Sequence, residues 1–229
     1  MKEKRKVLVN ADKTCNLYIV DVDLYKKTLM DIIIAKYIKA PIGILNDINN
    51  EAAEIIPKNK IKRKIRKFTD NSAFITLKDH KDNLPHSLKC RLINPAKSSI
   101  RIVSKNILDE IIPKIEEKIK LKQWKSTDNV IKWFNKIKNK NRYTFIKFDI
   151  EKFYPSISKG LLLKSIEFAK KYAKITNPEI ETILHLCKTV LMHNNEVWIK
   201  KDAEKDLFDV LIGSYHGAEV CKLIGFFFY

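Results

Sequence analysis

The sequence has 229 residues, which is enough for one large or two small domains with a hydrophobic core. Its 45% hydrophobic content, with only 5 Gly and 7 Pro, excludes a low-complexity protein. The 45 Lys and Arg residues outnumber the 27 Asp and Glu residues. The resulting formal charge of +18 favours a polyanionic partner, and an inert basic surface is the alternative.

The four cysteines are scattered along the chain without a CxxC pair. This spacing argues against a zinc site or a disulfide framework and indicates reduced thiols in an intracellular protein, without distinguishing nucleus from cytoplasm. The basic N-terminus is not followed by the apolar stretch of a secretory signal. No apolar run is long enough to span a bilayer, so we expect no membrane partner.

The N-terminal part of the chain combines short strands, a helix and a basic run. Residues 7–9 and 17–20 are predicted strands on either side of a polar turn, and residues 21–37 have the spacing of an amphipathic helix. In the basic run, residues 58–67, seven side chains are Lys or Arg. Such a run is usually a solvated helix face, and the alternative is a track that binds phosphates without reading sequence.

A hairpin is predicted next, from strands at residues 72–77 and 89–95 joined by a polar turn. Lys78 and Lys81 lie on one arm and Arg91 on the other, so the hairpin should carry cations at its base. Arginine grips phosphate with a planar fork, which suits a triphosphate ligand. The alternative is a hairpin edge that lysines keep soluble.

Two helices are predicted between residues 106 and 138. A short strand at 101–105 is expected to precede a helix at 106–120, in which Pro113 should cause a kink or end the first half. Ser126 or Thr127 can cap the next helix, 128–138, which carries lysines along one side.

The central stretch is a predicted strand, residues 143–149, that ends in an acid. It is rich in aromatic and β-branched residues, and Pro155 prevents it from continuing as a central strand. Asp149 would therefore stand at the end of a buried strand, just before a turn. Two-metal phosphoryl transfer needs such a rigidly held carboxylate at the edge of a cleft. The alternative is an ordinary strand that ends in a solvated Asp.

The C-terminal third is predicted to be mainly helical. A helix should begin at Ser156 or Ser158 and continue to residue 173, a second helix covers residues 179–192, and a short strand covers 196–199. Near the end, Gly213 and a second glycine four residues later bracket a loop that opens a helix. Glycine-rich turns at helix starts let the backbone approach a ligand closely.

The segment Phe148-Asp-Ile-Glu-Lys-Phe-Tyr-Pro-Ser-Ile157 resembles the first palm motif of reverse transcriptases, an Asp followed five positions later by Tyr or Phe. The resemblance implies that Asp149 binds two catalytic Mg²⁺ ions, helped by the backbone carbonyl of Ile150. It also implies that Tyr154 is the steric gate that screens the sugar 2′ position of the nucleotide.

Two further segments resemble the same family. The predicted hairpin resembles the fingers hairpin, which implies that Arg91 and Lys78, in preference to Lys81, hold the triphosphate of a dNTP. The segment around Gly213 resembles the second palm motif in a variant form, with Ile-Gly-Ser where many members have Gln-Gly-Ser. The third palm motif, an aromatic-x-Asp-Asp hairpin, is missing, because the sequence contains no Asp-Asp pair.

The resemblance therefore implies an α+β fragment with reverse-transcriptase-like fingers and an incomplete palm, in which an antiparallel sheet has flanking helices and the thumb is absent. The expected divisions are an N-terminal extension and start of the fingers at residues 1–70, the fingers hairpin at 71–106, and the partial palm at 107–229.

The implied function is that of an RNA-directed DNA polymerase fragment from a retroelement, inactive as the isolated chain, with an RNA template, an RNA–DNA duplex and dNTP as partners. The alternatives are a non-catalytic basic remnant that binds nucleic acid, and an unrelated basic α/β protein.

Overall fold

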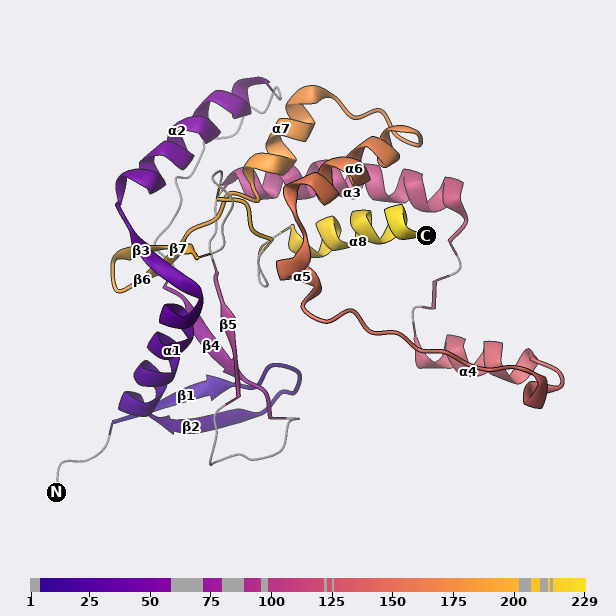
Figure 1. Cartoon of the computed structure of the whole chain (residues 1–229), viewed down its shortest axis with the longest axis horizontal. Helices are drawn as coiled ribbons and strands as arrows, with labels where there is room; N and C mark the ends of the chain where they lie inside the picture. Colours follow the sequence, from indigo (N-terminus) through magenta and orange to yellow (C-terminus); the bar gives the residue numbers. More distant parts are fainter. Residues whose placement is uncertain are drawn as a thin grey trace.

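The computed structural model of the chain describes residues 5–58, 72–79, 89–95, 99–121, 123–124, 126–201, 207–210, 214 and 216–229, without the side chains of 56–58 and 99–101. These residues form an α+β fold with small antiparallel sheets, which confirms the expected class at this level (Figure 1). The helices are α1 (Val22–Lys36), α2 (Gly43–Lys58), α3 (Ser99–Ile119), α4 (Thr127–Lys136), α5 (Phe153–Ser156), α6 (Lys159–Lys170), α7 (Asn177–His185) and α8 (Gly217–Phe228). The strands are β1 (Lys6–Asn10), β2 (Leu17–Asp21), β3 (Tyr37–Ala40), β4 (Phe74–Leu77), β5 (Cys90–Ile93), β6 (Leu191–His193) and β7 (Glu196–Lys200). None of the helices among these residues has both the length and the apolar character needed to cross a bilayer.

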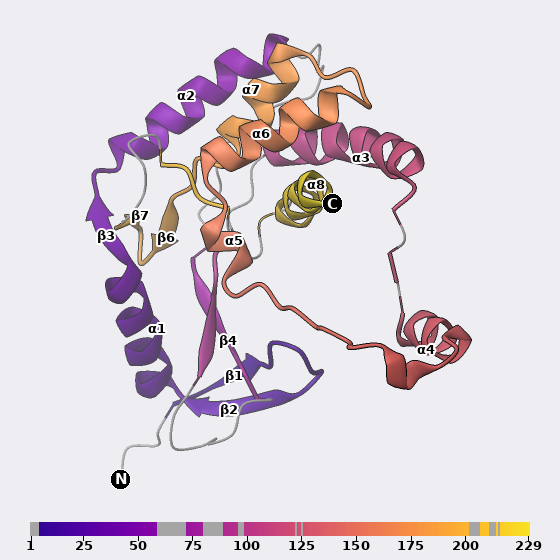
Figure 2. The same ribbon diagram turned by 45° about the vertical axis from the view of Figure 1, so that its right-hand side comes forward.

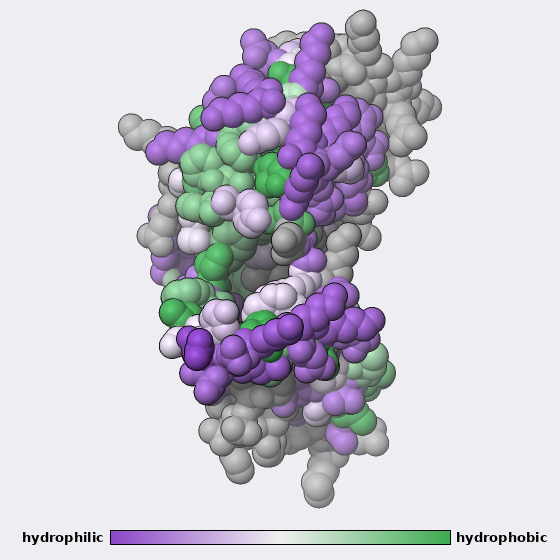
Figure 3. Space-filling model, turned by 90° about the vertical axis from the view of Figure 1, so that its right-hand side faces the viewer, coloured by the Kyte–Doolittle hydropathy of each residue, from purple (hydrophilic) through white to green (hydrophobic). Residues whose placement is uncertain are grey.

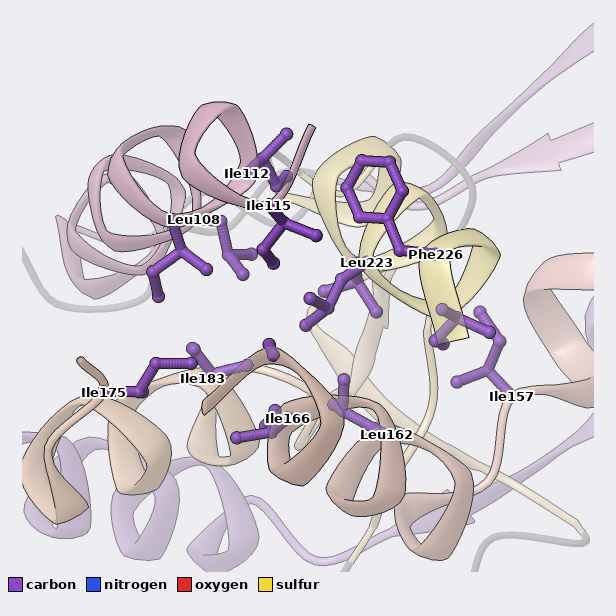
Figure 4. Packing of buried hydrophobic residues seen from close by; sticks show 14 of the residues in the cluster. Leu108, Ile112, Ile115, Ile157, Leu162, Ile166, Ile175, Ile183, Leu223 and Phe226 are labelled. Carbon is purple, nitrogen blue, oxygen red and sulfur yellow. The ribbon is translucent and has the colours of Figure 1, made fainter. Parts of the chain in front are cut away.

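The main hydrophobic core is built by α3, α6, α7 and α8 (Figure 4). Leu108 and Ile115 lie two turns apart on α3 and are fully buried. Leu162 and Ile166 lie one turn apart on α6 and face them, and Leu223 of α8 packs between these helices. The 3- and 4-residue spacing of apolar side chains therefore both forms these helices and joins them.

Two hairpins lie next to each other at the other end of the molecule (Figure 1). In the first, β1 pairs with β2 from Lys6↔Asp21 to Asn10↔Leu17, and in the second β4 pairs with β5 from Phe74↔Ile93 to Leu77↔Cys90. A parallel bridge between Ala11 and Leu77 joins them. The predicted strands are confirmed here, whereas the turn of the second hairpin and residues 59–67 of the basic run lie outside the described residues.

A three-stranded sheet in the order β3-β7-β6 corrects the prediction for this part of the chain. The strand predicted at 196–199 is confirmed as β7, but the helix predicted at 179–192 is wrong beyond His185, because residues 191–193 form β6. Leu191 pairs opposite Trp198 of β7, and both side chains are buried. The apolar residues of this stretch therefore fill a sheet instead of a helix stripe.

The strand predicted at 101–105 is also wrong, because these residues belong to α3. Ser104 and Leu108 are both buried and lie four residues apart, so the helical spacing begins earlier than the β-branched residues suggest. Pro113 lies inside α3 and does not end it. The proposed divisions after residues 70 and 106 stay predictions; the second falls within α3.

Helix α4 stands apart from the helical core, at the end of an arm (Figures 1 and 2). It begins where predicted, since the side chain of Ser126 accepts a hydrogen bond from the backbone N–H of Asn129 at 3.3 Å. No side chain of α4 is buried. The apolar face of this helix is therefore largely exposed in the part of the chain that the structure describes.

Residues 143–150 run in an extended path from the α4 arm to α5, and the strand predicted at 143–149 is wrong (Figure 2). A strand needs a ladder partner, and within the described part of the chain no other strand pairs with this segment. The apolar side chains are correspondingly exposed, Phe148 by 86%. We call residues 143–150 the extended segment below.

Candidate functional site

Arg91 lies on β5, opposite Thr76 of β4, and its guanidinium is held in place by an acid from the neighbouring hairpin. Its Nη1 donates to Oδ1 of Asp12 at 2.8 Å. The Asp12 side chain is only 5% exposed and that of Arg91 is 32% exposed. The backbone N–H of Asp12 donates to the carbonyl of Leu77 at 2.7 Å, so both the main chain and the side chain of Asp12 anchor the two hairpins together.

A second polar cluster closes the same junction between the hairpins. Asp79, just after β4, accepts hydrogen bonds from the side chains of Thr14, Asn16 and Tyr18 in the turn and strand that follow β1, at 3.1 Å for Asn16 and 3.2 Å for Tyr18. These three donors fix the direction of the Asp79 carboxylate. The turn end of the β4–β5 hairpin is therefore attached to β2 and to the turn that precedes β2.

Lys78 occupies the other arm of the hairpin, as expected. Its backbone N–H donates to the carbonyl of Lys89 at 2.8 Å, which extends the β4–β5 pairing by one residue. Burial raises the pKa of the neighbouring Cys90 thiol, and the charge of Lys78 opposes this shift. Lys78 and Arg91 thus lie at the same end of one hairpin, whereas Lys81, the alternative to Lys78, lies outside the described residues.

Tyr154 of α5 brings this hairpin into relation with α8. Burial raises the pKa of the Tyr154 hydroxyl. Cys221 of α8 accepts the hydrogen bond of this hydroxyl and raises the pKa further, as does the Glu219 carboxylate. The charge of Arg91 lowers the pKa. Arg91 is therefore within electrostatic range of Tyr154, although 63 positions separate them in the sequence. Helix α5 lies against α8, and we call this grouping of Tyr154, the first turns of α8 and Arg91 the convergence.

Helix α8 is held in this position by ion pairs with α3. Lys105 of α3 lies 3.1 Å from Oε1 of Glu219 and 2.7 Å from Oδ2 of Asp109. Hydrogen bonds to Asp109 and Glu219 raise the pKa of the Lys105 ammonium. Glu219 thus holds α8 against α3, and Cys221 links α8 to Tyr154 of α5.

Asp149, the expected metal ligand, lies outside this convergence. It is exposed, on the extended segment, five residues before Tyr154, and Ile150 beside it is exposed as well. Among the described residues no group of three or more His, Cys, Asp and Glu side chains is arranged to hold a metal ion. One carboxylate and one carbonyl do not fit a two-metal site, so the described residues alone do not compose a place for two Mg²⁺ ions.

The expected nucleotide-binding residues therefore divide into three groups. Arg91 and Tyr154 are brought together, and Lys78 lies on the same hairpin as Arg91. Gly213 lies outside the described residues, although the helix expected after it is present as α8.

Sequence reasoning missed the partners that orient these groups, namely Asp12, Lys105 and Cys221. Asp12 stands in a polar turn between two short strands, where an acid is ordinarily solvated, and only the approach of a second hairpin makes it a buried ion-pair partner. Cys221 was expected to be a reduced thiol, and none of the four cysteines forms a disulfide. Burial raises its pKa to about 11, so it acts here as a neutral hydrogen-bond partner.

Comparisons of the chain with protein-family models, with curated proteins and with solved structures find no match. Neither substrate nor partner is therefore suggested by a relative.

Proposed function

We propose that this chain is the fingers and partial palm of an RNA-directed DNA polymerase of the reverse transcriptase type, and that by itself it binds nucleic acid and nucleotide without joining nucleotides. The observation that carries the proposal is the convergence of Arg91, Tyr154 and α8. These come from the three segments that resemble family motifs, and nothing in their local sequences requires them to meet. A cation, an aromatic ring and a helix start near one another suit the phosphate and sugar of a nucleotide.

In this proposal each side chain has a separate task. The Arg91 guanidinium, oriented by Asp12, neutralises the triphosphate of an incoming dNTP, and Lys78 adds a second cation on the same hairpin. The ring of Tyr154, oriented through Cys221, lies against the sugar and disfavours a 2′-hydroxyl. Asp149 and the Ile150 carbonyl would be ligands of Mg²⁺ only in a palm completed by further carboxylates, because the described residues alone do not compose that site.

Nucleic acid would be bound through the net charge of +18, concentrated in the basic run and on the α4 arm. Lys132 and Lys136 lie on α4 and are exposed, and Lys138 and Lys140 follow directly. Such lysines bind phosphates by releasing counterions and do not read sequence. A purely nucleic-acid-binding role, without any nucleotide site, is the second candidate. The lack of a metal-binding cluster among the described residues favours it.

Nucleotide binding distinguishes the two candidates. Binding of fluorescent dNTP and NTP analogues in the presence of Mg²⁺ should show a preference for dNTP. Arg91→Ala should weaken the binding of both about tenfold or more, since a charge-assisted phosphate contact is lost. Tyr154→Ala should abolish the preference, whereas Tyr143→Ala, at an exposed ring outside the convergence, should retain it. Equal binding of dNTP and NTP by the unchanged protein would contradict the proposed role of Tyr154.

Salt titration tests the nucleic-acid half of the proposal. A labelled RNA–DNA duplex should bind less tightly as salt rises, with a linear dependence of log K on log salt. In Lys132→Gln/Lys136→Gln the slope should become less steep by about 1.8, because each phosphate contact contributes about 0.9. The matched control is Lys26→Gln/Lys27→Gln, two exposed lysines of α1 on the opposite side of the molecule from α4, which should keep the original slope (Figure 1).

A further inference from the structure

The extended segment has two faces with different surroundings. Phe145 packs against aromatic rings of α4, with its ring centroid 5.3 Å from that of Phe134 and 6.2 Å from that of Trp133. The alternate residues Ile146, Phe148 and Ile150 lie on the other face and are 71%, 86% and 63% exposed. Figure 3 views the side of the molecule on which α4 lies, and hydrophobic surface is exposed there between hydrophilic groups.

The backbone of the extended segment also lacks a ladder. The N–H of Tyr143 donates to the carbonyl of Lys140 at 3.2 Å, and the described part of the chain offers residues 144–150 no pairing strand. The segment nevertheless has the composition of a strand, with aromatic and β-branched side chains. An extended, apolar stretch with unpaired N–H and C=O groups is a template for the addition of another strand.

The order of side chains in the segment makes it complementary to itself. In an antiparallel pair centred on Phe148, Lys147 of one copy stands opposite Asp149 of the other, and the same pair recurs on the other side of the centre. Ile146 then stands opposite Ile150, and the two Phe148 rings meet at the centre. The charges attract on one face, and the exposed apolar residues of both copies meet on the other.

We propose that two copies of this chain associate by pairing their extended segments as antiparallel strands about a two-fold axis at Phe148. The pairing satisfies the backbone groups along one edge of each segment, and it covers part of the apolar face with the same face of the second copy. In each copy the Phe145 ring packs on α4 of the same chain. Both α4 arms therefore lie on the face of the two-stranded pair that carries Phe145. This association does not depend on the proposed function, because it requires neither nucleic acid nor nucleotide.

The mass of the protein in solution tests the pairing. In sedimentation equilibrium without nucleic acid, the 26.8 kDa chain should approach twice that mass as its concentration rises to about 100 µM. Lys147→Asp places two acids opposite each other, and Asp149→Lys places two lysines opposite each other, so each variant should weaken dimerisation about tenfold or more. The double variant Lys147→Asp/Asp149→Lys restores opposite charges and should dimerise as the unchanged protein does.

Two controls separate this interface from others. Ile19→Lys alters an exposed side chain of β2, 69% exposed, and should leave the dimer intact, whereas Phe148→Lys should abolish it. All these side chains are exposed, so the variants should unfold at the same urea concentration as the unchanged protein.

A monomer at every concentration would overturn the proposal. A dimer that Ile19→Lys disrupts, or that the double variant fails to restore, would also overturn it, because another surface or another register would then be responsible.

Discussion

The ion pair between Asp12 and Arg91 offers the most direct test of how the hairpins are held together. Arg91→Ala removes the guanidinium and leaves the Asp12 carboxylate without its cation at a side-chain exposure of 5%. Lys39 and Glu196 form a similar contact at 2.6 Å, but with side chains 60% and 42% exposed. The two pairs therefore differ mainly in burial, and Lys39→Ala is a matched control.

The difference in burial sets the expected magnitude. Removing one partner of a buried ion pair costs about 3–5 kcal/mol, because an uncompensated charge is left in a low-dielectric site. Arg91 is about one-third exposed, and water can partly replace it, so we expect Arg91→Ala to lower the free energy of unfolding by about 2–3 kcal/mol. Lys39→Ala should cost less than about 1 kcal/mol, as exposed pairs do.

Urea denaturation followed by circular dichroism measures both free energies of unfolding. A double-mutant cycle with Asp12→Ala then isolates the coupling between the two side chains, which should exceed that of the Lys39–Glu196 pair. Adding salt should weaken the exposed pair and change the Asp12–Arg91 coupling little. If Arg91→Ala costs no more than Lys39→Ala, then Asp12 is not buried by the β4–β5 hairpin and the described junction is wrong.

Three further outcomes are expected. Leu162→Ala should lower the free energy of unfolding by about 2–5 kcal/mol, because removal of this fully buried side chain leaves a cavity. Leu24→Ala, at a 46% exposed position, should change the free energy of unfolding by less than about 1 kcal/mol in the same urea titration. At pH 8 iodoacetamide should modify exposed Cys15 well before Cys221, because a pKa of about 11 leaves the Cys221 thiol almost entirely protonated. Peptide mass mapping should show that Cys221 reacts faster as the pH rises toward 11. The 229-residue chain should incorporate no dNTP on a primed RNA template with Mg²⁺ or Mn²⁺, since the described residues offer Asp149 no cluster of metal ligands; robust primer extension would contradict this.

Local sequence determined those elements whose stabilising contacts lie within a few residues. The helix starts at Ser126 and Ser158 follow from side-chain caps to backbone N–H groups three residues ahead. The β4–β5 hairpin follows from two apolar runs separated by a polar turn, and the α6 stripe from apolar residues four apart. In each case the interaction partner is close in the sequence, so the pattern of residues already contains it.

Only the tertiary structure decided the elements that need a distant partner. Residues 143–149 are rich in β-branched and aromatic residues and residues 191–193 (Leu-Met-His) are not, yet it is 191–193 that form a strand, β6, because β7 lies beside them. Residues 143–149 stay extended because no strand of the described chain pairs with them. The ion pair of Asp12 with Arg91 joins residues 79 positions apart, and the meeting of Arg91 with Tyr154 depends on how α5 and α8 pack. A strand ladder and a buried ion pair each need two specific groups at hydrogen-bonding distance, and the path of the chain between them sets that distance.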